Sequence, residues 1–457
     1  MLEFDFLKRL GIEKNINTID CKKSYSFYDS NTNNLIIELY LNKDYCKCET
    51  CASLFIRVQK TFVSTVKTQT AEACNALVHV HRRSYICDNN HVHRQDNPFT
   101  FEGRRITIQK DIGILTDLRD MTNTFTAVAK KYQVSTTYVI NLFDKKVELK
   151  RLNLPEVLSI DEVYGRKLTY KGYCFVLYAP QWKKIVDVLD SRKKLDLIDY
   201  FARISLEEKS KVKYVSMDLY ETYRIVIKKC LPNAIICADP FHVVKQLVTC
   251  FESIRKRVMR RYEELKNQGH NYYWLYKKYK WMLLKDLSKI KDVHYVVSKS
   301  GMIMNKYQIV KCMLELDETL ELAYNLMMIY RNFVATETID TAEEKLNTII
   351  SQFKEAHIKE YADFIRIMNN WHNEIINSFN MVNGHKITNG PMERVNKDIK
   401  TIIRVSFGSN NFTRMRNRIM FCINDNAPIL SYRKKNTNKQ KGKPRGNYKI
   451  KKEINKK

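Results

Sequence analysis

Three short apolar runs that each end in an aspartate place the tightest constraint on how this chain folds. They are Val157–Asp161, Val212–Asp218 and Ala234–Asp239. Apolar runs of this length, bounded by polar residues, are typical of buried β-strands. Each such strand delivers a carboxylate at the point where it leaves the sheet. The pattern therefore predicts a sheet with acidic side chains at its strand ends.

The segments between these runs predict the order of the sheet. Two further apolar strands are expected at 173–179 and 184–189, and a helix precedes each of the later aspartate strands. The order β-β-β-α-β-α-β is that of a ribonuclease-H-like sheet in a mixed α/β domain. The first and fourth strands are neighbours in such a sheet, so we expect Asp161 and Asp218 side by side.

Two adjacent carboxylates point to a divalent cation, because they repel each other unless a cation separates them. Hard oxygen ligands of this kind suit Mg²⁺ or Mn²⁺. Two such ions, about 4 Å apart, activate a water or a 3′-hydroxyl and stabilise the leaving oxygen of a phosphodiester. The alternative is that each aspartate only ends a strand or caps a helix. Asp239 is the rival of Asp218, which we prefer because its strand follows the expected order; Asp239–His242 is interpreted as a structural junction.

A third acid lies on a basic helix near the C-terminus. The segment 388–404 begins with a turn and continues as a helix in which Glu393, Asn396 and Lys400 share one face. A carboxylate on this face can hold a metal while basic side chains bind DNA phosphates. The alternative is an ordinary charged surface helix. The candidate phosphate-binding residues are Arg394, Lys397, Lys400 and Arg404.

The charge of the chain points to a polyanionic partner. Lys and Arg total 79 against 50 Asp and Glu, which gives a net charge of +29. Nucleic acid is the first candidate for such a basic protein, and a Lys-rich composition without a partner is the alternative. The segment 431–457 is expected to be a disordered basic tail. No apolar run approaches the ~20 residues of a membrane span, so a cytoplasmic protein without a membrane partner is expected.

Cysteine and histidine spacing near the N-terminus predicts a zinc site. The chain has 12 cysteines, and in a reducing compartment these are reduced, buried or metal-bound. A CxxC pair is followed by a later Cys-x₃-His pair, and two such pairs supply the four ligands of tetrahedral Zn²⁺. Cys46 and His93 are alternative ligands, and buried thiols without metal are the alternative to zinc. The favoured ligands are Cys48, Cys51, Cys87 and His91.

The segment 124–146 has the spacing of a helix-turn-helix. Ala129 allows the two helices to approach closely, Gln133 lies where the turn is expected, and Ser135 can cap the second helix. A plain αα-hairpin is the alternative, but a basic chain favours DNA binding through the major groove. The side chains expected to face the DNA are Thr136, Thr137, Tyr138 and Asn141.

Four ordered sequence blocks resemble the DDE transposases of bacterial insertion sequences, in particular the ISL (lactobacillus-type) family. They are SIDEVYGRK around Asp161, VSMDLYETYR around Asp218, CADPFHVVKQL from Cys237, and TNGPMERVNKDIKTIIR around Glu393. The resemblance implies that Asp161, Asp218 and Glu393 form a catalytic triad. The family usually has a second CxxC, whereas here Cys87 is followed by His91.

The resemblance also implies a function and its partners. A bacterial, nucleoid-associated transposase would bind the terminal inverted repeats of an insertion sequence through the zinc knuckle and the helix-turn-helix. It would hydrolyse a phosphodiester with Mg²⁺ or Mn²⁺ and join the freed 3′-hydroxyl to target DNA. Because two ends of double-stranded DNA must be held together, a homodimer on DNA is expected. The alternatives are a non-catalytic sequence-specific DNA-binding protein, such as a repressor or domesticated transposase, and a structure-specific nuclease.

The predicted fold class is multidomain α+β, with a ribonuclease-H-like catalytic domain interrupted by a helical insertion and preceded by DNA-binding modules. The predicted segments are a zinc-knuckle domain at 1–100, the helix-turn-helix at 101–150, the first catalytic part at 151–240, the helical insertion at 241–385, the acid-bearing helix at 386–430 and the basic tail at 431–457.

Overall fold

The computed structural model describes most of the chain before residue 425. The described ranges are 17–31, 34–43, 47–48, 50–53, 57–69, 75–100, 104–165, 172–264, 272–285, 287–297, 302–406 and 410–424. The chain forms two compact units: unit 1 comprises Met1–Thr116, Thr137–Val147 and Pro428–Lys457, and unit 2 comprises Asp117–Thr136 and Glu148–Ala427. The predicted disordered tail at 431–457 lies outside the described residues.

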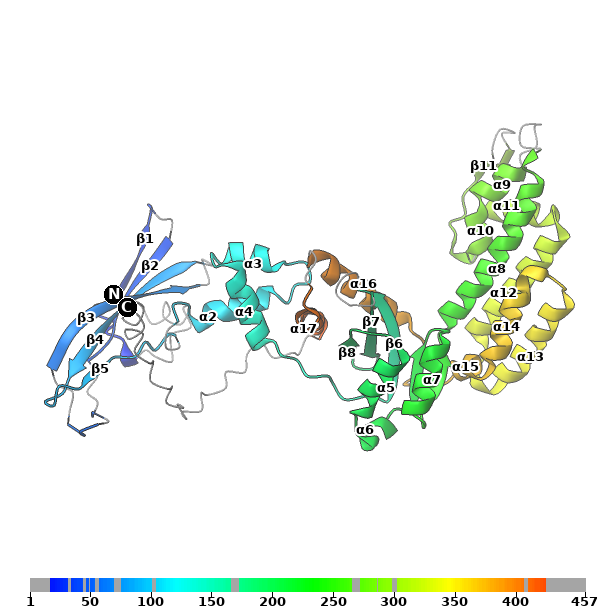
Figure 1. The fold of residues 1–457 in the computed structure, drawn as a ribbon. Helices are drawn as coiled ribbons and strands as arrows, with labels where there is room; N and C mark the ends of the chain where they lie inside the picture. Colours follow the sequence, from blue (N-terminus) through cyan, green and yellow to red (C-terminus); the bar gives the residue numbers. More distant parts are fainter. Residues whose placement is uncertain are drawn as a thin grey trace, which may run out of the picture. The chain divides into compact units, whose positions relative to one another are not determined.

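Unit 1 is built on a five-stranded sheet (Figure 1). Its strands are β1 (Tyr25–Asp29), β2 (Asn34–Tyr40), β3 (Arg57–Thr68), β4 (Ala76–Ile86) and β5 (Val92–Arg94). The order is β1-β2-β4-β3, and β5 pairs with β4. Ile37 and Leu39 of β2 and Val78 and Val80 of β4 are buried in one cluster, because alternate residues of a strand face the same side. The described residues of this unit also form α2 (Ile108–Asp117) and most of α4 (Thr136–Lys146).

The sheet of unit 2 has the predicted neighbours. Its strands are β6 (Val157–Tyr164), β7 (Tyr173–Ala179), β8 (Lys184–Leu189), β9 (Tyr214–Met217) and β10 (Ile235–Ala238). They lie in the order β10-β9-β6-β7-β8. β7 is antiparallel to both β6 and β8, whereas β9 is parallel to β6 and β10 is parallel to β9. The predicted pairing of the first strand with the fourth is therefore confirmed, and the mixed α+β class is as expected.

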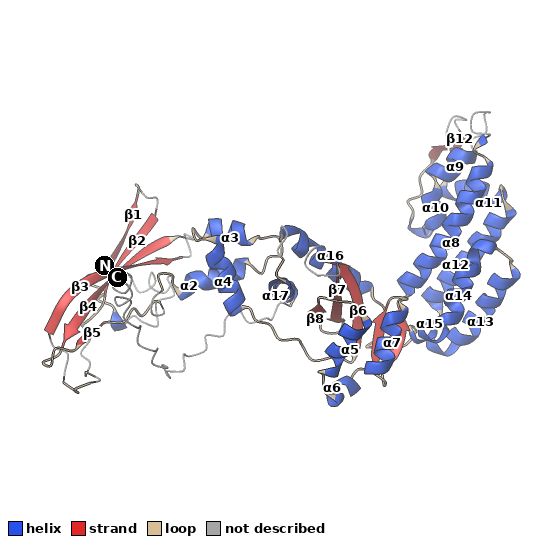
Figure 2. Ribbon diagram, in the orientation of Figure 1, coloured by secondary structure: helices blue, strands red, loops and turns tan. Residues whose placement is uncertain are grey.

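Helices cover both faces of this sheet. On one face Leu158 and Ile160 pack with residues of α5 (Lys194–Ala202) and α7 (Glu221–Cys230), and the short helix α6 (Leu206–Ser210) lies between these two in the chain. On the other face Val163 and Val176 pack with α16 (Gly390–Val405) and α17 (Phe412–Ile423). Figure 2 shows these two helical layers in blue beside the red strands. The acid-bearing helix α16 thus lies directly against β6, the strand that carries Asp161.

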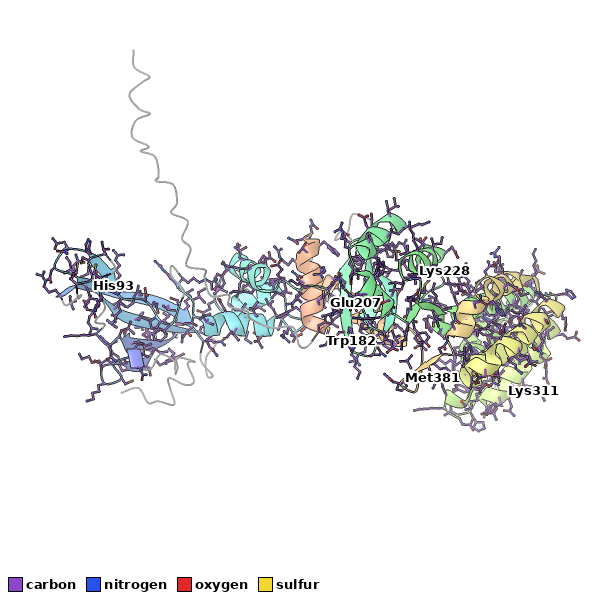
Figure 3. All side chains as sticks on the ribbon, turned by 90° about the horizontal axis from the view of Figure 1, so that it is seen from below. His93, Trp182, Glu207, Lys228, Lys311 and Met381 are labelled. Carbon is purple, nitrogen blue, oxygen red and sulfur yellow. The ribbon has the colours of Figure 1, made fainter. Side chains whose placement is uncertain are left out.

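A helical insertion follows β10 and returns to the same strand. Its helices are α8 (Pro240–Arg261), α9 (Tyr272–Lys278), α10 (Lys280–Leu284), α11 (Lys306–Glu315), α12 (Glu318–Thr336), α13 (Ile339–Glu355), α14 (Ala362–Asn370) and α15 (His372–Asn377). Buried aromatic side chains such as Phe251, Tyr330 and Phe353 fill its core, while outer residues such as Lys311 are exposed (Figure 3). The side-chain amide of Asn377 in α15 donates to the Ile236 carbonyl of β10 at 3.0 Å.

Small elements complete the insertion and lead to α16. The strands β11 (Tyr295–Val297) and β12 (Met302–Met304) pair as a hairpin, as do β13 (Met381–Val382) and β14 (His385–Lys386). Two 3₁₀ turns, η4 (Leu287–Lys289) and η6 (Lys359–Tyr361), connect helices. No helix among the described residues is long and apolar enough to cross a membrane.

Candidate active site and metal-binding clusters

Three aspartates lie in a row across three parallel strands. Asp218 and Asp239 directly follow β9 and β10, as predicted, whereas Asp161 lies inside β6, which continues to Tyr164 because it pairs further with β7. Each aspartate is two residues beyond a member of one aligned row, namely Ser159, Ser216 and Cys237, and side chains two positions apart on a strand face the same side. The separate apolar runs of the sequence therefore converge on a single acidic site.

Asp161 is held in a buried position near a second carboxylate. Burial, and then the charge of Asp218, raise its pKa from 3.8 to about 6. The side-chain amide of Asn396 in α16 donates to Asp161 Oδ2 at 2.5 Å, and the backbone N–H of Glu162 donates to Oδ1 at 2.7 Å. These two donors orient the carboxylate of Asp161, while the negative charge of Asp218 raises the free energy of its ionised form.

A histidine lies between the other two aspartates. The Nδ1 atom of His242 is 2.8 Å from Asp218 Oδ1 and 2.8 Å from Asp239 Oδ2. Burial alone would lower the pKa of His242, but its contacts with the two carboxylates raise it to about 10. The imidazole is therefore a cation at neutral pH and balances the negative charge of both neighbours. The ligand atoms of these three residues lie within 4.8 Å of one another.

The interpretation of Asp239–His242 as only a structural junction is incomplete. Asp239 does begin α8, and it is 3% exposed, but the same segment places an imidazole against Asp218. The signal was present in the sequence, because a histidine three residues after an N-terminal helix residue returns to that residue after one turn. What the sequence did not reveal is that Asp218 would contact the same Nδ1 atom of His242.

Glu393 lies on the first turn of α16, and its side chain pairs with Lys397. Its side chain is 61% exposed, and its carboxylate is 3.3 Å from Lys397 Nζ. Asn396, one turn further along, is buried and contacts Asp161. Among the described residues, the group of acidic and histidine ligand atoms within 4.8 Å contains neither Glu393 nor Asp161. The helix is thus positioned beside the acidic row, with Glu393 at its solvent side.

The basic side chains of α16 are available to solvent. The four candidate phosphate-binding residues, which are all exposed, are Arg394, Lys397, Lys400 and Arg404. Of the three residues expected to share one face, Asn396 is buried while Glu393 and Lys400 are exposed. The face is therefore divided: Asn396 on its buried edge contacts Asp161 of β6, and its outer edge carries charge.

The predicted zinc ligands come together in unit 1. Cys51 Sγ lies 3.7 Å from Cys87 Sγ, and His91 Nδ1 lies 3.5 Å from Cys87 Sγ and 3.6 Å from Cys48 Sγ. Zn²⁺ with bonds of ~2.3 Å to sulfur and ~2.0–2.1 Å to nitrogen sets sulfur–sulfur edges of about 3.8 Å and sulfur–nitrogen edges of about 3.6 Å in a tetrahedron. The four donors therefore fit this ion. His93 lies on β5 outside the group (Figure 3), and Cys46 lies outside the described residues.

The local backbone and polarity of this cluster favour thiolates. Two tight turns, with positive φ at Ala52 and Asn90, bring each pair of ligands together. Hydrogen bonds from the side chain and backbone of Ser53, and from His91, lower the pKa of Cys51 to about 5. Since zinc binds the deprotonated sulfur, a thiol with a lowered pKa loses its proton to the metal more readily.

The predicted helix-turn-helix segment contains two helices, α3 (Phe125–Lys131) and α4. Thr124 caps α3 by accepting a hydrogen bond from the Ala127 N–H at 2.8 Å. Gln133 in the turn has a φ of 49°, the left-handed conformation for which glycine is usual. The contact units divide this segment, so α3 falls in unit 2 and most of α4 in unit 1. DNA binding by this segment stays a prediction.

The side chains expected to face DNA differ in their surroundings. Thr137 and Asn141 are exposed, and Thr136 is half-buried. Tyr138 is also half-buried, and its hydroxyl donates to Asp111 Oδ1 in α2 at 2.5 Å. This hydrogen bond is within unit 1, so part of Tyr138 stabilises the pairing of α2 with α4.

Comparison with known proteins adds one finding. A family model of the ISL3-type DDE class, described as a transposase, matches residues 158–419. The match covers more than half of the chain and contains the acidic row, the helical insertion, α16 and most of α17. No curated protein matches the chain.

Proposed function

Because the chain belongs to the ISL3-type DDE transposase family, we propose that it is a DNA transposase that cleaves and joins DNA at the ends of an insertion sequence. The observation that carries this proposal is the acidic row, in which three aspartates follow one aligned row of residues across β6, β9 and β10 and Asp161 contacts Asn396 of the acid-bearing helix. Burial and the charge of Asp218 also raise the pKa of Asp161 to about 6, and such shifts are frequent at active sites. The strand order β8-β7-β6-β9-β10, read from the opposite edge, supports a ribonuclease-H-like catalytic domain.

The residues of the row fit a divalent metal site. Asp161 and Asp218 supply oxygen ligands, and the charged imidazole of His242 already compensates the second aspartate. Glu393, whose carboxylate is exposed on the adjacent helix, would supply the third carboxylate ligand. Mg²⁺ or Mn²⁺ held by these residues would supply an activated water or 3′-hydroxyl and stabilisation of the leaving oxygen of a phosphodiester.

The protein's own residues orient the reaction. Asn396 and the Glu162 N–H hold both oxygens of Asp161, which fixes the direction of its remaining lone pairs. The exposed cations of α16 bind backbone phosphates on either side of the cleaved bond, and such contacts set the register of DNA without reading its sequence. The zinc cluster and the segment 124–146 bind the terminal inverted repeats, and a homodimer holds the two ends together for joining.

A strand-joining assay tests this function. The protein is incubated with a labelled inverted-repeat end, Mg²⁺ and a target plasmid, and joined product is measured for the wild type and for Asp161→Asn. Asp199→Asn is the matched control, because Asp199 lies on α5 with a 78% exposed side chain. We expect joined product from the wild type and the control, and none from Asp161→Asn.

Other outcomes of the same assay identify the alternatives. Specific binding of the repeat without cleavage contradicts the proposal and favours a non-catalytic DNA-binding protein. Cleavage that ignores the repeat sequence and yields no joined product favours a structure-specific nuclease.

A further inference from the structure

The helices α8 and α16 begin next to each other, joined by a hydrogen bond between their N-cap residues. Neither helix is capped by the side chain of its N-cap residue. Asp239 precedes α8 and Asn389 precedes α16. Aspartate and asparagine at such positions normally accept a hydrogen bond from their own helix. Here neither side chain does so. Both side chains instead contact other elements of the active-site region.

Asp239 connects α8 with α16 and with the second acid. Its Oδ1 atom accepts a hydrogen bond from the backbone N–H of Asn389 at 3.1 Å, in a buried setting. Its Oδ2 atom is 2.8 Å from His242 Nδ1, which also lies 2.8 Å from Asp218. One buried carboxylate therefore contacts both the start of the acid-bearing helix and the imidazole that neighbours Asp218.

Asn389 connects the same helix with the strand of the first acid. Its side-chain amide donates to the Ile160 carbonyl at 3.1 Å, also in a buried setting. Ile160 directly precedes Asp161, and the Asn389 carbonyl accepts hydrogen bonds from the N–H groups of Met392, at 2.9 Å, and Glu393, at 3.3 Å. Asn389 thus contacts two backbone segments. Its side chain binds the carbonyl that precedes Asp161 in β6, and its carbonyl accepts from the Glu393 N–H in α16.

We propose that Asp239 and Asn389 are positioning residues that hold the first turn of α16, and with it Glu393, in register with Asp161 and Asp218. The proposal rests on the proposed transposase function. It assigns a task to Asp239 other than that of the second catalytic acid. Because a metal shared by acids on separate elements needs each ligand placed within a fraction of an ångström, loss of this connection weakens metal binding and slows the chemical step.

Asn389→Ala is the sharpest perturbation, because it removes the amide donor to Ile160 and leaves every backbone N–H in place. Asp239→Ala removes the acceptor for the Asn389 N–H, and Asp239→Asn restores an oxygen acceptor there. Asn305→Ala is the matched control: Asn305 begins α11, and its side chain caps its own helix by accepting from the Gln308 N–H at 2.9 Å. This control loses a cap and leaves the acidic row untouched.

Two readouts separate positioning from a loss of stability. For Asn389→Ala we expect kcat for end cleavage to fall about tenfold with KM for DNA within about twofold, since the lost interaction acts in the transition state. We expect Mn²⁺ affinity, measured by electron paramagnetic resonance without DNA, to fall severalfold in the wild-type background and to stay unchanged in Glu393→Gln. Asp239→Asn should recover most of the activity that Asp239→Ala loses. Asn305→Ala should lower Tm without changing kcat or Mn²⁺ affinity.

The outcomes are distinguishable. An active wild type together with unchanged kcat and Mn²⁺ affinity in Asn389→Ala overturns the positioning role and leaves the transposase function standing. An equal loss of Mn²⁺ affinity with and without Glu393 also overturns it, because the effect then does not pass through that side chain. A wild type that neither binds Mn²⁺ nor cleaves the DNA end overturns the proposed function itself, and the positioning role with it.

Discussion

Replacing Asp161 with asparagine is expected to abolish DNA cleavage and, at pH 8 without metal, to make the fold more stable. The charged carboxylate is held in a buried position beside Asp218, so the folded state binds its proton more tightly than the unfolded state does. A raised folded pKa of this kind contributes stability that is complete below pH 4 and is lost as the pH rises through about 6. Asparagine carries no charge, so it avoids this loss.

The magnitude follows from the pKa. A rise from 3.8 to about 6, at about 1.4 kcal/mol per pKa unit, corresponds to roughly 3 kcal/mol at pH 8. Asparagine has one oxygen, so it keeps the hydrogen bond from the Asn396 amide and loses that from the Glu162 N–H, at a cost of about 1 kcal/mol. The remaining stabilisation of about 2 kcal/mol corresponds to a gain in Tm of about 5 °C at pH 8.

The assay is thermal unfolding of the wild type and Asp161→Asn at pH 8 and at pH 5, with EDTA and with Mg²⁺. We expect the difference in Tm to be large at pH 8 and to shrink at pH 5, where Asp161 is mostly protonated. We also expect Mg²⁺ to raise the Tm of the wild type, because a ligand that binds only the folded state stabilises it, and to leave Asp161→Asn almost unchanged.

Two results would refute the reasoning. One is an equal or lower Tm for Asp161→Asn at pH 8, which would show that the carboxylate is not strained by burial and repulsion. The other is a stabilisation of the same size at pH 5 and pH 8, which would show that the effect does not depend on charge. Asp199→Asn, with its exposed side chain, should show no pH-dependent gain.

Three further predictions concern the metal ligands and the DNA contacts. Cys51→Ser should reduce zinc content from about one ion per chain to near zero, measured by metal analysis, with loss of repeat binding; retained zinc would contradict the assigned ligand set. Asn396→Ala removes a charge-assisted hydrogen bond of about 1.5–3 kcal/mol, so the pKa of Asp161 should rise further and the acidic limb of the pH–rate profile should move to higher pH; an unmoved limb would count against the contact. Lys400→Ala should weaken binding to all DNA sequences alike and flatten the dependence of log Kd on log salt by about one unit; a loss confined to the repeat sequence would indicate base contact instead.

Much of the sheet of unit 2 was predictable from local pattern. Apolar runs predicted its strands, and β9 and β10 end directly before their aspartates as expected; β6 continues past Asp161 to Tyr164 because β7 pairs with it. The pairing of β6 with β9 followed from the order of strands and helices. The cysteine and histidine spacing likewise predicted the four donors that the structure brings together, since metal-ligand spacing is a local property of the chain.

The role of the α16 face was harder to predict. Helical periodicity placed Glu393, Asn396 and Lys400 together, but it did not show that Asn396 turns inward to Asp161 while Glu393 pairs with Lys397. Periodicity gives the angle of a side chain about the helix axis. Which angle faces the sheet depends on how the helix packs, and that is decided by apolar neighbours such as Met392 and Ile399.

The sequence by itself determined the local elements and the residue types they carry: the strands that bear or precede the aspartates, the acid-bearing helix, the four candidate zinc ligands and a strongly basic composition. These follow from residue type and spacing along the chain. Only the tertiary structure decided how His242 lies between Asp218 and Asp239, and how Asp239 and Asn389 join the starts of two helices. The contacts of His242 with Asp218 and of Asp239 with Asn389 connect separate elements of the chain, so they form only when packing of the helices against the sheet brings these polar groups together.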